Sequence, residues 1–284
     1  MTRAGPDKMG TRIVRFLDEQ MNLRVGEAAG ERLVRVYGQS GENRRETAAE
    51  AVPVGRFLPP VEPPNIFAIG RNYRAHVRET GARLPKTPLI FQKATTSLTA
   101  HEAPIILPKA APDEVDFEAE LAIVIGRAAR DVSPGEALDC VRGYTCANDV
   151  SARDCQRNDK QWARAKGFDT FCPLGPWLVP VDELDPDNCP IRSRLNGRVM
   201  QDSNTRDMIH SCRELISYLS HQFTLLPDTV ILTGTPDGVG FARQPSVFLR
   251  PGDRIEVEIE GIGTLVNDVL AAAQSEPPAG GGAD

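Results

Sequence analysis

The chain has few of the residues that hold transition metals or covalent cross-links. It contains only four histidines and six cysteines, and no two cysteines form a CxxC pair. A structural zinc site needs clustered Cys and His ligands, so we do not expect one here. An even cysteine count is weak evidence for disulfides in a chain of 284 residues, and we therefore expect reduced thiols.

Long apolar segments and an excess of positive charge are also missing. No apolar run reaches the roughly 18 residues of a membrane span, and the first residues lack the apolar core of a secretory signal. The 33 basic and 39 acidic side chains give a formal charge of −6, whereas nucleic acids and anionic membranes attract basic surfaces. We therefore expect a cytoplasmic protein without a nucleic-acid or membrane partner.

The motifs of several enzyme classes are absent as well. The chain contains no GxGxxG, GxxxxGK[ST], GxSxG or HExxH segment. Residues 234–240 are glycine-rich and follow a strand pattern, but no helix pattern comes after them. Two interpretations stay open for this loop: a structural turn, or a loop that offers backbone N–H groups to an anion.

The apolar pattern predicts many strands and few helices. Residues 11–58 hold short strand-like runs, and a proline cluster follows at 59–64. We predict a small β-rich domain over residues 1–60, a main domain over 61–272, and a disordered tail over 273–284. Helices are expected only within 150–165 and over 207–219. The predicted fold class is α+β, predominantly β, built as a sandwich or roll.

The strand pattern at residues 115–125 carries two acids on one face. Glu118 and Glu120 are two residues apart, and alternate side chains of a strand point to the same side, so apolar residues line the other face. Neighbouring acids repel each other unless water or a cation lies between them. A solvated edge strand explains the pair, and so does a buried site for a hard divalent cation.

A third acid, Asp149, follows the apolar run at 144–147, as at the end of a strand. Asp149 is a candidate ligand for the same cation, although Asp149 or Ser151 could instead cap a helix. Three carboxylates with water suit Mg²⁺ or Mn²⁺ and leave positions for a substrate. The spacing of the three acids does not by itself bring them together.

His76 and Glu79 are three residues apart in a polar segment, which places them on one face of a helical turn. A carboxylate that holds an imidazole raises its basicity, and such a pair can take a proton from water. A surface ion pair on a solvated helix explains the same pattern.

Seven segments, in order, resemble the fumarylacetoacetate hydrolase family. Within residues 63–270 they are IGRNYRAHVRETG, PLIFQKATTS, DEVDFEAELAIVIG, NDVSARDCQ, ARAKGFDTFCPLGPW, LNGRVMQDSNTRDMI and ILTGTPDGVG. The resemblance implies a mixed β-roll around Mg²⁺ or Mn²⁺, usually in a homodimer. The N-terminal module looks like the extra domain of many bacterial members. One departure is Ala94, where many relatives carry proline.

The resemblance also implies roles for individual residues. It makes Glu118, Glu120 and Asp149 the metal ligands and places Lys166 near the metal as a catalytic residue. His76 and Glu79 match a pair on a lid helix that orders over the ligand. The implied substrate contacts are Arg71, Tyr73, Lys93, Arg153, Gln156 and Thr235.

Family members act on 2-oxo or 2,4-dioxo acids, so the resemblance implies a metal-dependent C–C hydrolase or decarboxylase. Its substrate would be of the acylpyruvate, fumarylpyruvate or oxaloacetate type, converted through a metal-bound enolate. For hydrolysis, Glu79 would orient His76, which would deprotonate a water. The alternatives are an isomerase or hydratase of 2-hydroxy-dienoates in aromatic catabolism, a 2-keto-3-deoxy sugar acid dehydratase, and a non-catalytic 2-oxo-acid-binding protein.

Overall fold

The computed structural model describes residues 10–37 and 47–272, and β-strands make up most of the regular structure there. The four α-helices in these ranges are short, so the prediction of an α+β, predominantly β fold is confirmed. None of the described helices is long and apolar enough to cross a membrane. The tail predicted for residues 273–284 lies outside the described residues.

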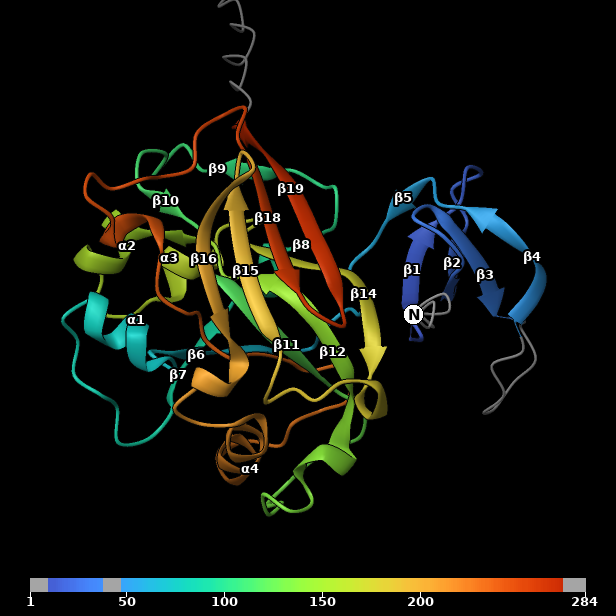
Figure 1. The fold of residues 1–284 in the computed structure, drawn as a ribbon, viewed down its shortest axis with the longest axis horizontal. Helices are drawn as coiled ribbons and strands as arrows, with labels where there is room; N and C mark the ends of the chain where they lie inside the picture. The colour runs from blue at the N-terminus through green and yellow to red at the C-terminus, as the bar shows by residue number, and fades with distance from the viewer. Residues whose placement is uncertain (1–9, 38–46, 273–284) are drawn as a thin grey trace, which may run out of the picture.

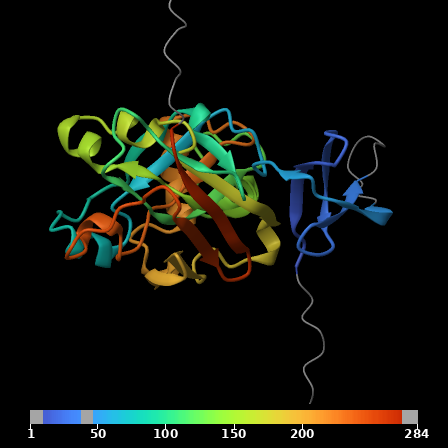
Figure 2. The same ribbon diagram turned by 90° about the horizontal axis from the view of Figure 1, so that it is seen from above.

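Five strands near the N-terminus form a group beside the main body (Figure 1, and from above in Figure 2). They are β1 (Ile13–Leu17), β2 (Leu23–Ala28), β3 (Leu33–Tyr37), β4 (Thr47–Pro53) and β5 (Arg56–Phe57). Strands β1 to β4 pair antiparallel in chain order. Strand β1 also pairs with β14, where Ile13 lies opposite Leu178, so the group continues the main sheet.

The main sheet has twelve strands, and its path is β4-β3-β2-β1-β14-β12-β11-β17-β6-β7. Its other strands are β6 (Ile66–Gly70), β7 (Leu89–Lys93), β8 (Leu98–Ala100), β11 (Ala119–Ile125), β12 (Val141–Asn148), β14 (Cys172–Pro180) and β17 (Val230–Leu232). Most neighbours are antiparallel, but β17 runs parallel to β6 and β14 runs parallel to β8. The sheet is therefore mixed, as the family resemblance implies.

A second sheet of five strands, in the order β16-β15-β18-β19-β9, shares a core with the first. Its strands are β9 (Ile105–Leu107), β15 (Pro190–Leu195), β16 (Arg198–Asn204), β18 (Arg254–Ile259) and β19 (Gly263–Ala271). In β18 only alternate residues are buried, as its charged–apolar alternation predicts. A small ribbon pairs β10 (Val115–Asp116) with β13 (Ser151–Ala152).

The strand predicted at residues 115–125 is split between β10 and β11. At the break, the Phe117 N–H donates to the Asp116 carboxylate, and the Glu118 N–H donates to the side-chain oxygen of Asn148. Every residue of β11 is buried, because β12 and β17 flank the strand and apolar clusters cover both of its faces. The alternative of an edge strand with a solvated acidic face is therefore wrong.

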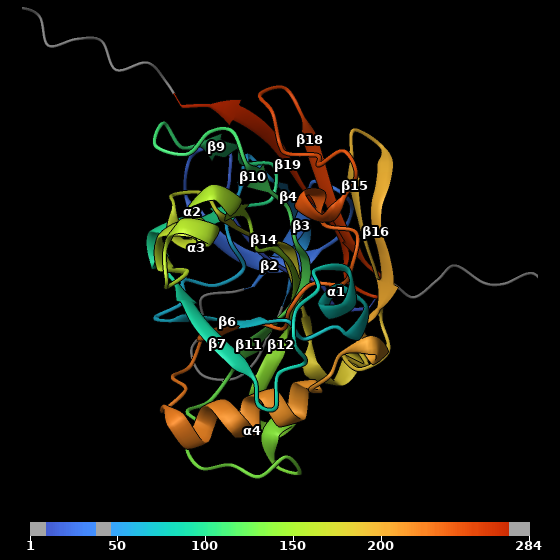
Figure 3. The same cartoon turned by 90° about the vertical axis from the view of Figure 1, so that its left-hand side faces the viewer.

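The helices are α1 (Arg74–Glu79), α2 (Arg153–Asn158), α3 (Ala163–Gly167) and α4 (Cys212–Gln222). Short 3₁₀ turns occupy Thr95–Ser97, Ala137–Cys140, Val181–Glu183, Thr205–Asp207 and Gly240–Ala242. Helix α4 begins five residues later than the predicted start at 207, because Ser211 and Glu214 form a capping box. The apolar side of α4 packs on the core beneath β11, and Figure 3 shows the helix lying across this end of the main sheet.

Candidate active site

Strand pairing brings the three predicted acidic ligands together. Antiparallel β11 and β12 place Ala119 opposite Asn148, so the residues just beyond this pair, Glu118 and Asp149, become neighbours. The Asp149 N–H donates to the Glu118 carbonyl oxygen at 2.9 Å and extends the ladder. Glu120 lies in β11 itself, two residues from Glu118. Acids separated by about thirty positions in sequence thus share one end of a strand pair.

The three carboxylates form a compact buried cluster. One oxygen from each of Glu118, Glu120 and Asp149 lies within 4.8 Å of the others. Burial, followed by the charges of Asp149 and Glu118, raises the pKa of Glu120 well above its usual range. Burial alone would also raise the pKa of Glu118, but the adjacent Lys166 and Arg153 lower it to about 2. The cluster therefore contains one carboxylate without full charge compensation.

Three cationic side chains contact this cluster. Lys166 Nζ lies 2.8 Å from Glu118 Oε2 and 2.7 Å from Asp149 Oδ2, while Lys93 Nζ lies 2.5 Å from Asp149 Oδ1. Arg153 pairs with Glu118 at 2.7 Å and joins it to a fourth buried acid, Asp116, at 2.9 Å. Four carboxylates thus face three cations among the described residues, and one negative charge is unmatched.

This donor set fits a hard divalent cation. Mg²⁺ and Mn²⁺ prefer carboxylate oxygens, and only Glu120 among the three acids lacks a cationic partner in the described residues. Within the described residues, the Glu120 carboxylate instead accepts a hydrogen bond from the Gly234 N–H, which lies 2.7 Å from Oε2. Burial, with the charges of Asp149 and Glu118 adding to it, raises the pKa of Glu120, and a divalent cation held by the three acids would offset both effects by favouring the ionised carboxylate. The identity of the ion stays a prediction.

His76 and Glu79 form the predicted pair on α1. His76 Nδ1 lies 2.9 Å from Glu79 Oε1, and Glu79 Oε2 accepts from the Gly238 N–H at 2.9 Å. His76 is only 8% exposed, whereas Glu79 is exposed and is bound to a second loop, so the pair lies at the protein surface with its imidazole buried. Because Nδ1 is engaged by Glu79, Nε2 is the nitrogen left to face a substrate.

The glycine-rich loop at 234–240 has a structural explanation that its sequence did not reveal. Its backbone N–H groups donate to three carboxylates of the chain itself: Gly234 to Glu120, Gly238 to Glu79, and Gly240 to Asp116 at 2.8 Å. Gly238 has a φ of 94°, and a Cβ there would lie 2.3 Å from the Met200 carbonyl oxygen. The loop therefore binds carboxylates of the chain itself. These three N–H groups are not available to a substrate anion.

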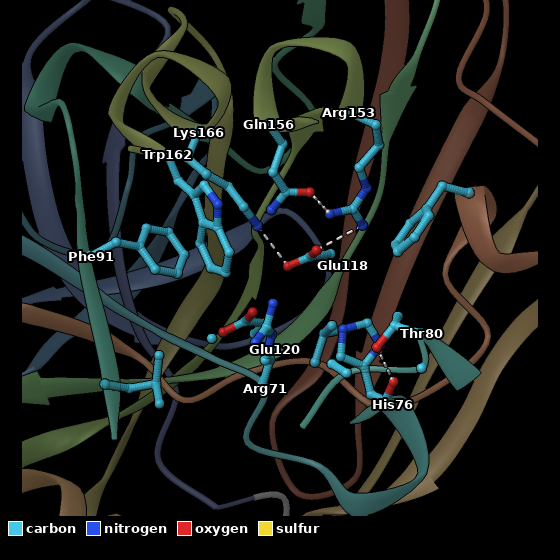
Figure 4. Close-up of a pocket in the computed structure, with 16 residues that line it drawn as sticks. Arg71, His76, Thr80, Phe91, Glu118, Glu120, Arg153, Gln156, Trp162 and Lys166 are labelled. Atoms are coloured by element: carbon cyan, nitrogen blue, oxygen red, sulfur yellow. Dashed lines mark hydrogen bonds and ion pairs between the residues drawn. The ribbon is translucent and has the colours of Figure 1, made fainter. Parts of the chain in front are cut away.

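A cavity of about 420 Å³ joins these groups. Figure 4 shows His76 and Thr80 on one side, Phe91 and Trp162 on another, and Glu118 between Lys166 and Arg153. Eight of the twelve predicted site residues line it, and two more contact the lining residues. The eight are Arg71, His76, Glu118, Glu120, Arg153, Gln156, Lys166 and Thr235, and the two behind them are Asp149 and Glu79.

Two predicted substrate contacts occupy other positions. Tyr73 is 1% exposed and packs in the main hydrophobic cluster, so the structure gives its ring a packing role. Lys93 has no exposed side-chain surface and lies behind Asp149, where its charge holds that carboxylate. Neither residue lines the cavity. Both differ from the expectation because a motif gives sequence order but not the direction of a side chain.

Sequence reasoning did not single out two buried residues that organise the site. Asp116 accepts from Arg153 Nε and from the backbone N–H groups of Gly240 and Phe241. Gln201 in β16 accepts from the Ala119 N–H at 2.9 Å and donates to Thr235 Oγ1 at 2.8 Å. Both residues lie in motifs that carry the family resemblance. For Asp116 the signal is a charged residue between the apolar Val115 and Phe117, whereas the polar strand around Gln201 gives no such signal.

The fold and this site define a mixed β-roll protein with a buried carboxylate centre that suits a divalent cation. The chain belongs to the fumarylacetoacetate hydrolase family, because residues 65–270 match the family model described as fumarylacetoacetate (FAA) hydrolase C-terminal. The family resemblance drawn from the seven sequence segments is thus confirmed.

Relatives with different activities share this fold. The mitochondrial oxaloacetate tautomerase Fahd2a of Rattus norvegicus is 44% identical over 234 residues, which cover 80% of this chain and 74% of the relative. A solved 2-hydroxyhepta-2,4-diene-1,7-dioate isomerase from Mycobacterium marinum is 37% identical with a TM-score of 0.81, covering 93% of this chain and 100% of that one. A solved fumarylacetoacetate hydrolase from Exiguobacterium antarcticum is 33% identical with a TM-score of 0.80, and the match covers 93% of this chain and 100% of that one.

Proposed function

We propose that this protein is a divalent-metal-dependent enzyme that moves a proton at the carbon beside the 2-oxo group of a small 2-oxo acid. The observation that carries the proposal is the position of the His76–Glu79 pair, with His76 lining the same cavity as Glu118 and Glu120. Enolisation of a 2-oxo acid requires a base near the acidic carbon and positive charge near the oxygen that becomes negative.

Glu118, Glu120 and Asp149 would hold Mg²⁺ or Mn²⁺ at one side of the cavity. When bound, the ion supplies a Lewis acid for the carboxylate and 2-oxo oxygens of the substrate. The chain adds its own positive charge there through Lys166 and Arg153, which already contact Glu118. Both cations would stabilise the negative charge that develops on the substrate oxygen.

His76 supplies the proton transfer. Glu79 accepts the hydrogen bond from Nδ1 and holds the imidazole with Nε2 as the free base. Nε2 takes a proton from the carbon beside the 2-oxo group, and the resulting imidazolium is stabilised by the Glu79 carboxylate. Return of that proton to a different atom of the same substrate completes a tautomerisation or isomerisation.

Proton transfer without bond cleavage is the first candidate reaction. The relative named oxaloacetate tautomerase and the solved structure named as a dienedioate isomerase support it. Cleavage of a C–C bond by hydrolysis or decarboxylation, which the sequence resemblance favours, is the second candidate. The solved fumarylacetoacetate hydrolase supports cleavage, for which His76 Nε2 would activate a water in place of the substrate carbon.

The test follows enol-to-keto conversion of oxaloacetate by ultraviolet absorbance, with acylpyruvate hydrolysis and release of CO₂ measured in parallel. With Mg²⁺ or Mn²⁺ the wild type should accelerate the enol conversion, and chelation should abolish the acceleration. His76→Gln should lower turnover by at least about 100-fold. Its affinity for Mn²⁺, measured by titration calorimetry, should stay unchanged because His76 is not a predicted ligand.

Glu118→Gln should have the complementary effect and weaken Mn²⁺ binding, because it removes one charged ligand. Full activity of His76→Gln would remove the pair from the mechanism. If the wild type accelerates only acylpyruvate hydrolysis or CO₂ release, the second candidate replaces the first. If no 2-oxo acid reacts with either metal, the proposed function fails.

A further inference from the structure

Asn72 is a buried polar residue to which the proposed reaction assigns no role. It lies between β6 and α1, is 1% exposed and does not line the cavity. Its side-chain amide donates to two backbone carbonyl oxygens, at 2.7 Å to Thr233 and at 3.0 Å to His210. Its side-chain oxygen accepts from the His210 N–H at 2.9 Å. Every hydrogen-bonding group of this side chain is thus bound to the backbone of a segment far away in sequence.

The bond to Thr233 reaches the carboxylate cluster through a single peptide group. The carbonyl that accepts from Asn72 belongs to the peptide whose N–H, on Gly234, donates to Glu120 Oε2 at 2.7 Å. A trans peptide is planar, and its C=O and N–H point in opposite directions, so holding the oxygen sets the direction of the N–H. A hydrogen bond to the carbonyl also polarises the peptide and strengthens the bond that its N–H donates.

Packing holds the same peptide against Asn72. Gly234 has a φ of 99°, and a Cβ there would lie 2.7 Å from Asn72 Cβ and 3.1 Å from the Ile69 carbonyl oxygen. On its other side, Thr233 is tied to β11, where its N–H and its hydroxyl group donate to the Leu121 carbonyl oxygen at 3.0 Å and 2.9 Å. The peptide is therefore clamped between β11 and Asn72, and a change at residue 72 alters its position.

The backbone of Asn72 leads directly into α1, the helix of the proposed base. Its carbonyl oxygen accepts from the Ile209 N–H at 2.7 Å, and Tyr73 forms a bridge with Met208. Tyr73 is the N-cap of α1, but its side chain makes no cap hydrogen bond. Contacts with residues 208–210 therefore hold the start of the helix in place of a side-chain cap.

A carboxamide is the side chain that satisfies all of these partners. The carbonyl oxygens of Thr233 and His210 need donors, and the His210 N–H needs an acceptor. An ionised aspartate has no donor, and an aliphatic side chain has neither a donor nor an acceptor. Loss of the amide leaves the Thr233 carbonyl without this donor and frees the peptide to rotate away from Glu120.

We propose that Asn72 is a positioning residue that keeps Glu120 and His76 in the relative placement that metal binding and proton transfer need. This inference rests on the proposed function, which gives Glu120 and His76 those two roles. Asn72 does not line the cavity, so it acts through other groups. It acts on Glu120 through the peptide of Gly234, and on His76 through the start of α1.

The test compares Asn72 with Asn267, a buried asparagine of the same kind outside the cavity. Asn267 in β19 is also 1% exposed, and its amide donates to the Ala100 and Ala103 carbonyl oxygens at 2.8 Å and 2.7 Å. Asn72→Ala and Asn267→Ala each remove an amide with two bonds to backbone carbonyls, so both should lower the free energy of unfolding by comparable amounts. Of the two, only Asn72→Ala removes the donor to the peptide of Gly234.

Mn²⁺ affinity and turnover separate the two variants. Asn72→Ala should weaken Mn²⁺ binding about tenfold by titration calorimetry, because the donor that orients the Glu120 carboxylate is no longer held. At saturating Mn²⁺ it should lower kcat for oxaloacetate about tenfold, or for an acylpyruvate if only that reacts, while KM stays within about threefold. Asn267→Ala should leave Mn²⁺ affinity and kcat within about twofold of the wild type.

The outcomes distinguish this proposal from the proposed function. Unchanged Mn²⁺ affinity and kcat in Asn72→Ala, or equal losses in Asn267→Ala, would overturn the proposal and leave the proposed function intact. If no 2-oxo acid reacts, the proposed function fails, but a loss of Mn²⁺ affinity confined to Asn72→Ala still supports the hold on Glu120. A wild type that binds no Mn²⁺ would overturn both. If Asn72→Ala does not fold, Asn72→Ser with Asn267→Ser as its control replaces it, with the same loss of Mn²⁺ affinity expected in Asn72→Ser alone.

Discussion

At the scale of single residues, Asp116 connects four hydrogen-bond donors from separate parts of the site. Its carboxylate is fully buried and accepts hydrogen bonds from the backbone N–H groups of Phe117, Gly240 and Phe241 and from Arg153 Nε. Burial raises its pKa even though Arg153 lies beside it. All four partners are hydrogen-bond donors. They are satisfied only if both side-chain positions of residue 116 are oxygens that can accept, as in aspartate.

Asp116→Asn should therefore destabilise the protein by about 2–4 kcal/mol, because one oxygen becomes an NH₂ group that faces other donors. It should also raise KM, since Arg153 loses one of the partners that fix its guanidinium, while Glu118 and Gln156 remain. Chemical denaturation gives the first quantity and steady-state kinetics the second. Asp113→Asn is the control, because it makes the same change three positions away on a side chain that is 88% exposed. A loss below about 0.5 kcal/mol in Asp116→Asn would contradict this account.

At the scale of elements, the loop at 234–240 connects parts of the site that are distant in sequence. It is hydrogen-bonded to Glu120 in β11, to Glu79 on α1 and to Asp116 in β10. The position of this one loop therefore affects both Glu120, a candidate metal ligand, and the His76–Glu79 pair. Any change in its backbone should alter catalysis as well as stability.

Gly238→Ala tests this connection. The new Cβ would lie 2.3 Å from a backbone oxygen, at a φ of 94° that already disfavours alanine. We expect a loss of stability greater than the roughly 1–2 kcal/mol of the unfavourable φ alone, and a lower kcat because Glu79 loses its backbone donor. Gly252→Ala isolates the φ effect, since its φ is 92° and nothing lies within 4 Å. Equal stability and unchanged turnover in the two variants would show that the loop does not position Glu79.

At the scale of the whole molecule, the N-terminal group contacts the main body around His101 as well as through the pairing of β1 with β14. Phe57 of β5 meets the His101 ring edge-on at 4.9 Å, and His101 Nδ1 accepts from the Val266 N–H of β19. Arg32 pairs with Glu102 next to it. Burial lowers the pKa of His101 from 6.5 to about 4, with Arg32 and Arg254 adding to the effect and Glu102 opposing it.

This lowered pKa predicts acid sensitivity. Between about pH 6.5 and pH 4 the unfolded chain binds a proton at His101 that the folded protein does not bind. The free energy of unfolding should therefore fall as the pH drops through this window, by up to about 1.4 kcal/mol per pH unit from this residue, and should be unaffected above it. Denaturation of wild type and His101→Gln across the window measures the difference. Parallel curves for the two proteins would show that His101 does not contribute.

The cellular location and the homodimer implied by the family stay predictions at this scale. The rat relative is mitochondrial, so family membership does not decide between compartments. The predicted domain boundary near residue 60 falls between β5 and β6. Strand β1 nevertheless pairs with β14, so the N-terminal group is joined to the main sheet and not only linked by the chain.

Much of the fold was predictable because strand periodicity is local. Alternation over residues 254–260 predicts β18, and apolar runs over 65–70 and 228–233 predict β6 and β17. All three strands are present within about two residues of these limits. The start of α4 was predicted wrongly because the apolar pattern extends beyond the helix, although Ser211 and Glu214 marked its true start in the sequence. Glu118, Glu120, His76 and Glu79 were identifiable because each pair is close in sequence.

The sequence by itself determined the strands, the family and the types of side chain available for metal and proton chemistry. These properties depend on neighbouring residues and on motif order. Only the tertiary structure decided that Asp149 joins Glu118, that Lys93 lies behind it, and that Asp116 connects Arg153 to the glycine-rich loop. Such contacts depend on strand register and on the direction of each side chain, which residues far apart in the chain determine together.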